Sequence, residues 1–426
     1  MGIKFRLIVM NFLQYAIWGA YLTSMGTYLV EAGLSAHIGI FYAMQGIVSI
    51  FMPAVVGIVA DRWIPAQRLL GLCHLLAALF MGSAGYYAWS AGAGVQFGTL
   101  FTLYALSVAF YMPTIALSNS VAYSVLESGG LDTVKSFPPI RVWGTVGFIC
   151  SMLVCDVAGF QTTYMQFVQC AVLGTALALY AVTLPDCPVS RGDEKKSLVE
   201  ALGLRAFALF KQKKMALFFI FSMLLGVSLQ ITNGFANPFI TSFRDIPEYA
   251  STFGANHANA LISLSQVSET LCILLIPFCL KRFGIKNVML MAMFAWVLRF
   301  GLFGLGNPGA GVWMFILSMI VYGVAFDFFN ISGSLFVNKE TDTTIRSSAQ
   351  GLFMIMTNGI GATIGTLGAQ AVVDKLVYSQ PTIAEQTAGW SASWLVFAGY
   401  ALCVAIVFAL VFKYKHDPEA IGTIEH

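Results

Sequence analysis

Residues 314–333, MFILSMIVYGVAFDFFNISG, form a run long enough to cross a bilayer as a helix, and Asp327 is its one charged side chain. A charge at membrane depth is costly and is tolerated against a partner or a watery cavity, so it marks a candidate functional position. Residues 138–153, PPIRVWGTVGFICSML, contain Arg141, and residues 260–278, ALISLSQVSETLCILLIPF, contain Glu269 in the same kind of setting. We therefore look for the function around these three residues.

The composition assigns the chain to the integral membrane proteins. Of its 426 residues, 58% are hydrophobic and 10% are charged, which is too apolar for a water-exposed surface. Apolar runs close to the roughly 20 residues that span a bilayer as helix predict an all-α protein, since the strands of a membrane barrel are short and alternating. We count twelve such runs, at residues 7–29, 38–60, 68–89, 97–119, 139–160, 164–184, 215–236, 258–280, 287–306, 312–334, 350–372 and 390–412.

The basic residues predict the orientation, because cytoplasmic loops of membrane proteins are enriched in Lys and Arg. With both termini in the cytoplasm, 19 of the 23 basic residues fall on the cytoplasmic side. Arg244 and Lys375 fall outside, and Arg141 and Arg299 fall within or at the edge of spans. The net charge of +3 reflects this topology, so we expect no nucleic-acid partner.

The sequence lacks the common motifs of enzymes and metal sites. Its eight cysteines and five histidines show no metal-ligand spacing, and it contains no nucleophile elbow, HExxH motif or phosphate loop. Gly361 and Gly365 follow no strand and have the small-residue spacing that lets membrane helices pack closely, so they do not indicate a dinucleotide site. We expect no metal, no cofactor and no enzymatic activity.

The loop from Pro185 to Lys214 divides the chain into two halves. Six apolar runs precede it, six follow it, and its second part has the spacing of an amphipathic segment with a basic end. Asp61-Arg62-Trp63 after the second run has an echo in Lys281-Arg282-Phe283-Gly284 after the eighth. We predict a six-helix bundle at 1–184, a cytoplasmic linker at 185–214 and a second six-helix bundle at 215–426, the architecture of the major facilitator superfamily.

Residues 57–62, GIVADR, resemble the loop motif of that superfamily, although Ile64 stands where a glycine is usual. Asp61 near a helix end can pair with Arg62 or with a neighbouring helix dipole in one conformation and be released in another. The two residues are therefore a candidate conformational clasp. The alternative is that they serve only as a topology anchor.

Polar and aromatic residues within the spans recur at spacings that place them on one helix face. They are Gln14, Trp18 and Tyr21 in the first run; Arg141, Thr145 and Phe148 in the fifth; Gln230 and Asn233 in the seventh; Gln266 and Glu269 in the eighth; and Tyr322, Phe326 and Phe329, beside Asp327 and Asn330, in the tenth. If these faces line one cavity, amides, two carboxylates, one guanidinium and several aromatic rings converge there.

This set of groups suits a neutral, flat, hydroxylated solute. Amides can read the edge of a nucleobase, aromatic rings can stack on it, and a carboxylate can accept hydrogen bonds from two sugar hydroxyls. Phosphate would need several cations, and Arg141 is the one we count at depth. A nucleoside therefore fits better than a nucleotide.

Each of these residues also has a structural explanation. Arg141 follows two prolines and could extend its side chain to the membrane interface. The amides could hold helices together, the aromatic rings could pack in the core, and Glu269 and Asp327 could belong to a buried ion pair.

Several blocks resemble the nucleoside:proton symporter family of the major facilitator superfamily, the bacterial nucleoside permeases, and the similarity runs nearly end to end. The blocks are residues 12–19, FLQYAIWG; 137–145, FPPIRVWGT; 229–233, LQITN; 265–270, SQVSET; 322–333, YGVAFDFFNISG; and 346–351, RSSAQG. The resemblance implies that the nucleoside site is lined by Arg141, Thr145, Phe148, Gln230, Asn233, Gln266, Glu269, Tyr322, Phe326 and Asp327.

The resemblance also implies nucleoside uptake with protons, uridine and adenosine being typical substrates, across a bacterial inner membrane, with no obligate protein partner. We expect the two halves to alternate access to a midplane site, with Glu269 or Asp327 loading a proton from outside. The acid farther from Arg141 is the better carrier, and the sequence leaves open which acid that is. A symporter of another hydroxylated solute such as a sugar, or a membrane receptor that does not transport, remain the alternatives.

Overall fold

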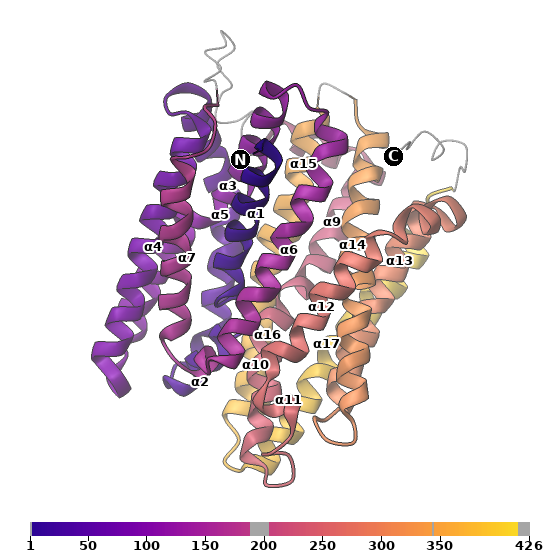
Figure 1. The fold of residues 1–426 in the computed structure, drawn as a ribbon. Coiled ribbons are helices and arrows are strands. Elements are labelled where there is room, and N and C mark those ends of the chain that lie inside the picture. Colours follow the sequence, from indigo (N-terminus) through magenta and orange to yellow (C-terminus); the bar gives the residue numbers. More distant parts are fainter. Residues whose placement is uncertain (1, 188–203, 343–344, 416–426) are drawn as a thin grey trace. The chain divides into compact units, whose positions relative to one another are not determined.

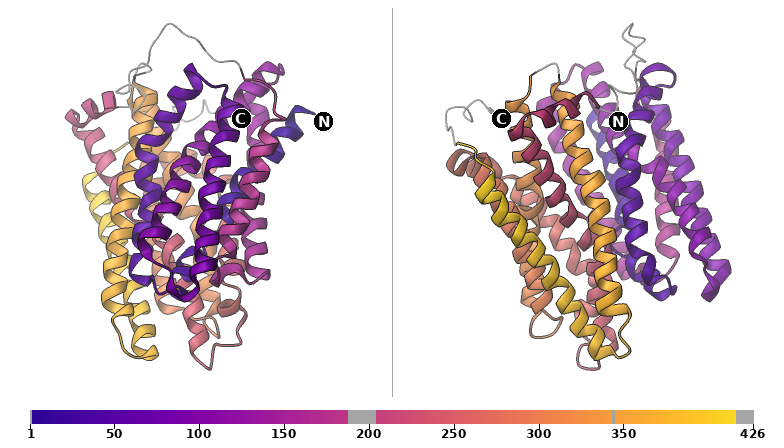
Figure 2. Two further views of the ribbon diagram at one scale, coloured as in Figure 1. Left: turned by 90° about the vertical axis from the view of Figure 1, so that its left-hand side faces the viewer. Right: turned by 180° about the vertical axis from the view of Figure 1, so that it is seen from behind.

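A computed structural model describes residues 2–187, 204–342 and 345–415, except the side chains of residues 61, 62, 134, 204 and 347. Every regular element in these ranges is a helix. The contacts divide the chain into two compact units, one of Met1–His37 with Met44–Leu202 and one of Ile38–Ala43 with Gly203–His426. Within each unit the helices lie side by side as a bundle (Figures 1 and 2).

The first unit contains seven α-helices and three short 3₁₀ turns in its described residues. The α-helices are α1 (Ile3–Gly19), α2 (Met25–Glu31), most of α3 (Ile38–Arg62), α4 (Ala66–Ala91), α5 (Phe97–Ser128), α6 (Thr133–Val157) and α7 (Met165–Ala181), and the turns are η1 (Ser35–His37), η2 (Gly92–Gly94) and η3 (Phe160–Thr162).

The second unit is also helical throughout its described residues. Its α-helices are α9 (Lys213–Leu229), α10 (Ile231–Ser242), α11 (Phe253–Asn256), α12 (Ala258–Ile273), α13 (Ile276–Leu305), α14 (Val312–Glu340), α15 (Arg346–Met354), α16 (Ala362–Val373) and α17 (Ile383–Val411). Its short segments are the 3₁₀ turns η4 (Leu204–Lys211) and η5 (Phe243–Asp245) and the π-helical η6 (Ile355–Gly361) and η7 (Asp374–Tyr378).

All twelve apolar runs are helical over most of their length. Nine helical segments in the described residues are long and apolar enough to cross a membrane by themselves. The other three runs fall on the interrupted pair α1 and α2, on the 17-residue α7 and on α12, which ends at Ile273. The difference between twelve predicted runs and nine long apolar helices therefore comes from two helix interruptions and from one short helix.

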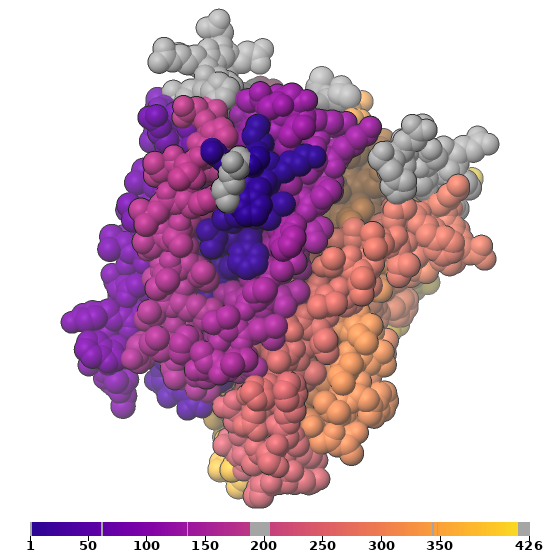
Figure 3. Space-filling model, in the orientation of Figure 1, coloured from indigo at the N-terminus to yellow at the C-terminus, as the bar shows by residue number. Residues whose placement is uncertain are grey.

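The outward faces of the helices are apolar. On α4, Leu72, Leu75 and Leu79 are 45%, 50% and 60% exposed. The surfaces of α4 and α7 are visible in Figure 3. Apolar side chains that recur on an exposed face of a long helix have lipid as their natural surroundings.

Contacts at one end of each unit fit an even number of crossings. In the first unit the Arg6 guanidinium donates to the carbonyl oxygen of Thr183 at 2.9 Å, so the start of α1 lies beside the chain just after α7. In the second unit Lys214 at the start of α9 pairs with Glu340 at the end of α14 at 2.7 Å, and Lys286 donates to the carbonyl of Ala409 in α17 at 3.0 Å.

Glycines bring particular helices into backbone contact. A Cβ at Gly147 of α6 would overlap the carbonyl oxygen of Phe12 in α1, and one at Gly19 of α1 would overlap the carbonyl of Phe148. In the second unit, a Cβ at Gly361 or Gly365 would overlap backbone atoms of α9. The packing role predicted for these last two glycines is therefore confirmed.

The α1–α6 contact predicts that Gly147→Ala destabilises the protein by about 1–3 kcal/mol, because the added methyl group forces the two backbones apart. The apparent melting temperature of purified protein in detergent should fall. Gly301→Ala is the matched control, since Gly301 also lies within a helix and a Cβ added there would have no neighbouring atom within 4 Å. An equal melting temperature for the two variants would show that the α1–α6 crossing tolerates a side chain.

Candidate functional site

The ten residues predicted to line the site are divided between the two units. Arg141, Thr145 and Phe148 lie on α6 in the first unit. The second unit holds the rest: Gln230, Asn233, Gln266, Glu269, Tyr322, Phe326 and Asp327.

In the first unit, Arg141 lies against an aromatic ring. Its guanidinium carbon is 3.9 Å from the centroid of the Tyr15 ring on α1, and its side chain is half-buried. Gly144, one turn further along α6, leaves room for this pair, since a Cβ there would stand 2.6 Å from the Tyr15 ring and 2.8 Å from Nη1 of Arg141. The cation–π contact stabilises the charge in a fixed position on α6.

Phe148 lies two turns along α6 from Arg141 and contacts Trp18 of α1. The two rings are perpendicular, with centroids 6.3 Å apart. The Trp18 indole donates to Oε1 of Gln45 on α3 at 3.3 Å, and the Gln45 amide donates to the Tyr104 hydroxyl at 2.9 Å. This chain of hydrogen bonds holds the Trp18 ring against Phe148.

Two residues of the first predicted span lie in the core of the first unit. Gln14 and Tyr21 are 0% and 1% exposed within the core of the first unit. The Gln14 amide donates to Thr114 Oγ1 at 2.8 Å, and its Oε1 lies 2.7 Å from Nε2 of His74. Gln14 therefore links α1 to α4 and α5 within the core of the first unit. Helical spacing shows which residues share a face and not what that face contacts.

In the second unit, the two amides of the seventh run lie at a break in the helix. Gln230 separates α9 from α10, and the Asn233 amide donates to Oε1 of Gln230 at 2.8 Å. Both side chains are half-buried. Interrupted membrane helices are typical of substrate sites in transporters, because they free polar backbone and side-chain groups at depth.

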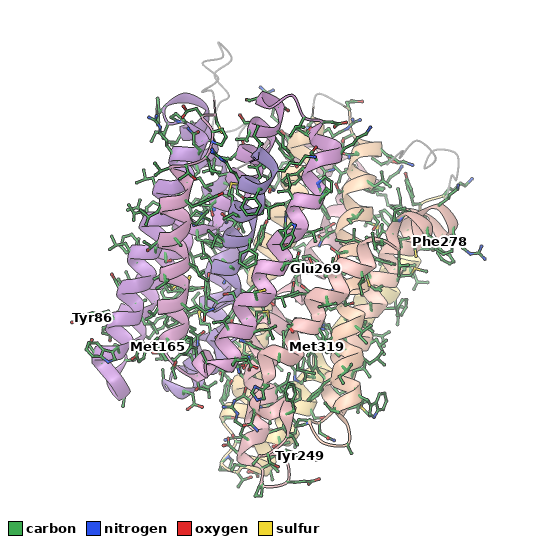
Figure 4. All side chains as sticks on the ribbon, in the orientation of Figure 1. Tyr86, Met165, Tyr249, Glu269, Phe278 and Met319 are labelled. Carbon is green, nitrogen blue, oxygen red and sulfur yellow. The ribbon has the colours of Figure 1, made fainter. Side chains whose placement is uncertain are left out.

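Helix α12 contributes Gln266 and Glu269, one turn apart and both half-buried. Glu269 is labelled on this helix in Figure 4. Neighbouring Ser265 and Ser268 are buried and bond to α14, the first to Sδ of Met319 at 3.1 Å and the second to the carbonyl of Ile320. These contacts fix the turn of α12 that carries Gln266 and Glu269.

Helix α14 contributes two aromatic rings and an acid. Tyr322 and Phe326 stack with centroids 5.6 Å apart and planes 16° from parallel. Asp327 is 6% exposed, and its Oδ2 has no hydrogen-bond partner in the described part of the chain. Glu269 lies within electrostatic range of both Asp327 and the Tyr322 hydroxyl, so the two acids and this ring form one cluster.

Sequence reasoning missed a second cation at depth. Arg299 of α13 is 2% exposed, whereas the sequence places it within or at the edge of a span and leaves Arg141 as the one cation counted at depth. Its guanidinium carbon is 4.6 Å from the centroid of the Tyr322 ring. The depth was hard to predict because Arg299 lies near the end of the ninth run, and its side chain is buried by the packing of α13 against Ser318 of α14.

Two further expectations concern other regions. The side chains of Asp61 and Arg62 lie outside the described part of the structure, so their role as a clasp stays a prediction. Among the described residues, no group of three or more His, Cys, Asp or Glu side chains is placed to hold a metal ion.

Comparison with known proteins places this arrangement in a family. The model of the nucleoside H+ symporters matches residues 1–417. The chain is 45% identical to the nucleoside permease NupG of Escherichia coli strain K12 over 431 residues, covering 100% of both chains. It is 48% identical to the xanthosine permease of the same strain over 424 residues, covering 99% of this chain and 98% of the permease.

Solved structures of transporters have a similar fold. A crystal structure of the nucleoside transporter NupG matches with a TM-score of 0.88 at 46% identity, covering 97% of this chain and 100% of the other. A peptide transporter of the POT type has the same fold, with a TM-score of 0.73 at 13% identity, 96% coverage of this chain and 93% of the other. The expected fold, an all-α membrane protein with two six-helix halves, is confirmed.

The family match covers nearly the whole chain, and both close relatives are permeases, so this is a multi-pass membrane transporter and not an enzyme. The chain belongs to the nucleoside H+ symporter family.

Proposed function

We propose that this protein takes up nucleosides together with protons, and that the residues of the two groups described above bind the nucleoside. The observation that carries the proposal is the cluster in the second unit. Helix α14 carries the buried Asp327 and the stacked rings of Tyr322 and Phe326. Helix α12 carries Glu269, which lies within electrostatic range of Asp327. Acids at membrane depth are the usual elements of proton pathways, and stacked rings suit a nucleobase.

The chemistry of the second group fits the two parts of a nucleoside. Gln230, Asn233 and Gln266 offer amide donors and acceptors for the edge of a base. Tyr322 and Phe326 offer aromatic surface for its face. In this proposal Glu269, half-buried and one turn from Gln266, accepts hydrogen bonds from ribose hydroxyls.

The first group supplies a charge and a ring. Arg141, held on the Tyr15 ring, can donate to a ribose or base oxygen without leaving its position. Phe148, held perpendicular to Trp18, offers a second apolar surface, and Thr145 lies between the two along α6. Neither group contains the several cations that a phosphate would need.

Asp327 and Glu269 are the proposed proton carriers. The Asp327 carboxylate is almost fully buried with one oxygen lacking a hydrogen-bond partner in the described residues, which is an unfavourable position for a permanent negative charge. A proton that neutralises it lowers this cost. Inward movement of each proton is worth about 2.3 kcal/mol per 100 mV of membrane potential, which can drive accumulation of a neutral solute.

We also propose the cytoplasmic membrane of a bacterium as the location, with both termini inside. The relatives named above are bacterial permeases. Within the second unit, Lys214 and Lys286 are at the end of the bundle that faces the cytoplasm in this orientation, in agreement with the distribution of basic residues. The division into 1–184, a linker at 185–214 and 215–426, and the clasp of Asp61 and Arg62, belong to the same proposal.

Uptake by purified protein in liposomes tests the function. Radiolabelled uridine and adenosine should accumulate when the outside is acidic and should equilibrate when a protonophore is added. Competition by excess free sugars but not by nucleosides would show a sugar symporter. Binding without flux would show a receptor.

Loss of the amides should weaken binding. Gln230→Ala, Asn233→Ala and Gln266→Ala should each reduce nucleoside affinity by about 1–3 kcal/mol, because a buried hydrogen-bonding edge is left unpaired. Titration calorimetry on purified protein measures the change. Asn287→Ala, at an exposed amide that bonds to Phe283, is the control and should bind normally. Unchanged affinity in all three site variants would remove the amides from the site.

The aromatic rings should act on every nucleoside alike. Phe148→Ala and Phe326→Ala should each cost about 1–3 kcal/mol of affinity for purines and pyrimidines, since stacking tolerates any base. The same calorimetry with a panel of nucleosides ranks the purine and pyrimidine nucleosides by affinity. A reversed order of purines and pyrimidines would mean that the ring selects the base instead of stacking on it.

The acids should be needed for coupling. Glu269→Gln and Asp327→Asn should lose accumulation driven by a pH gradient, because an amide cannot take up and release a proton. Exchange of internal for external nucleoside should stay measurable, since it needs no net proton movement. If both variants still concentrate nucleoside in response to an imposed pH gradient, neither acid carries the proton.

A further inference from the structure

His74 is a buried histidine that the transport scheme above does not use. It lies on α4 in the first unit, and its side chain is 0% exposed. Its ring packs edge-on against the Tyr111 ring of α5, with centroids 5.8 Å apart. One ring nitrogen, Nε2, lies 2.7 Å from Oε1 of Gln14 on α1. The other, Nδ1, has no hydrogen-bond partner in the described part of the chain.

The hydrogen bonds around Gln14 decide which ring nitrogen of His74 carries the proton. The Thr114 hydroxyl donates to the carbonyl oxygen of Tyr111 at 2.5 Å, so its oxygen can only accept from Gln14. The Gln14 nitrogen therefore faces Thr114, at 2.8 Å, and its Oε1 faces His74. Because Oε1 is an acceptor, Nε2 of His74 is the donor. In a neutral ring Nδ1 is then a bare acceptor, and burying it without a partner costs free energy.

A small cavity adjoins this ring. Its polar lining residues are His74, Tyr21, Ser107 and Tyr111, and residues of α1, α4, α5 and α7 enclose it. Water-sized atoms can occupy about 10 Å³ of it, which is close to the space that one water molecule needs. No Asp, Glu, Lys or Arg side chain of the described residues lines this cavity. A positively charged ring would therefore have no counter-ion there.

Two hydroxyl groups of the lining have already used their protons. Ser107 donates to a backbone carbonyl of α4 at 2.7 Å, and Tyr111 donates to one of α1 at 2.7 Å. Their oxygens can only accept from a further group, as Nδ1 of His74 can. A cavity with three acceptors in its lining requires a donor. Water supplies two O–H donors, and its own oxygen can accept from the Tyr21 hydroxyl, which also lines the cavity.

We propose that this cavity is a binding site for one water molecule, which donates a hydrogen bond to Nδ1 of His74. The second proton of the water goes to the oxygen of Ser107 or Tyr111. The water extends the hydrogen-bond chain that runs from Thr114 through Gln14 to His74, so it joins α1, α4 and α5 where apolar packing alone would leave an acceptor unsatisfied. This inference does not depend on the transported substrate.

Nitrogen NMR of the protein in lipid bilayers tests the water site. Labelling the carbonyl carbon of cysteine and the nitrogens of histidine selects His74, because Cys73–His74 is the one Cys–His step in the sequence. We expect a proton on Nε2, none on Nδ1, a Nδ1 signal shifted from its free position (without a hydrogen bond) to that of a hydrogen-bond acceptor, and magnetisation transfer from water to the ring. Protons on both nitrogens, a proton on Nδ1 alone, a Nδ1 signal at the free position or no transfer from water would overturn the proposal.

Tyr21→Phe shows whether a protein hydroxyl donates to Nδ1 in place of water. With water as the donor, this variant keeps Nδ1 at the hydrogen-bonded position and keeps the transfer from water, since the water retains both of its donors. A return of the Nδ1 signal to the free position would identify the Tyr21 hydroxyl as the donor, and the water site would be wrong.

Filling the cavity should displace the water. Cys170 lines the cavity with a short side chain, and Cys170→Met puts a longer apolar one in its place. The Nδ1 signal should move to the free position, and the melting temperature should fall because Nδ1 loses its partner. Cys403→Met, at an exposed cysteine, is the matched control and should change neither measurement.

An unchanged Nδ1 signal in a folded Cys170→Met variant would mean that the partner of Nδ1 lies outside this cavity, which contradicts the proposal. Should Cys170→Met fail to fold, judged by gel filtration, the spectra of the unaltered protein and of Tyr21→Phe decide.

Discussion

The free-energy cost of a charge away from water constrains the whole candidate site. A chain with 10% charged residues places most of its ions at helix ends, and the few that lie at depth require compensation from their surroundings. Arg141 lies on the Tyr15 ring, and Arg299 lies on Tyr322 and donates to Ser318. Arg141 is therefore stabilised by a π face, and Arg299 by a π face together with a neutral polar group.

The same constraint explains the irregular helices. A helix break at membrane depth exposes backbone groups that water cannot reach, so it occurs where protein groups or a cavity can satisfy them. At Gln230 the continuing backbone of α10 meets this need, since the N–H of Gly234 donates to the carbonyl oxygen of Gln230 at 3.2 Å. Gly284 lies at a different kind of interruption, where a φ of 78° lets the chain turn between the eighth and ninth runs.

The close crossing of α1 and α6 at glycines also positions two of the predicted site residues. The helices approach to backbone contact at Gly147 and Gly19, which places Tyr15 and Trp18 against Arg141 and Phe148. The close crossing and the two contacts are consequences of the same register, since a shift of either helix would separate both pairs. A rigid scaffold of this kind holds site residues in the orientation that binding requires.

The sequence by itself determined the membrane class, the twelve apolar runs, the family and the packing role of Gly361 and Gly365, because hydropathy and motif spacing are properties of neighbouring residues along the chain. It also grouped Gln230 with Asn233, which bond one turn apart. Only the tertiary structure decided that Gln14 links three helices in the core of its unit and that Arg299 lies buried beneath Tyr322. Helical periodicity specifies which residues share a face, whereas the environment of that face depends on contacts between segments far apart in the sequence.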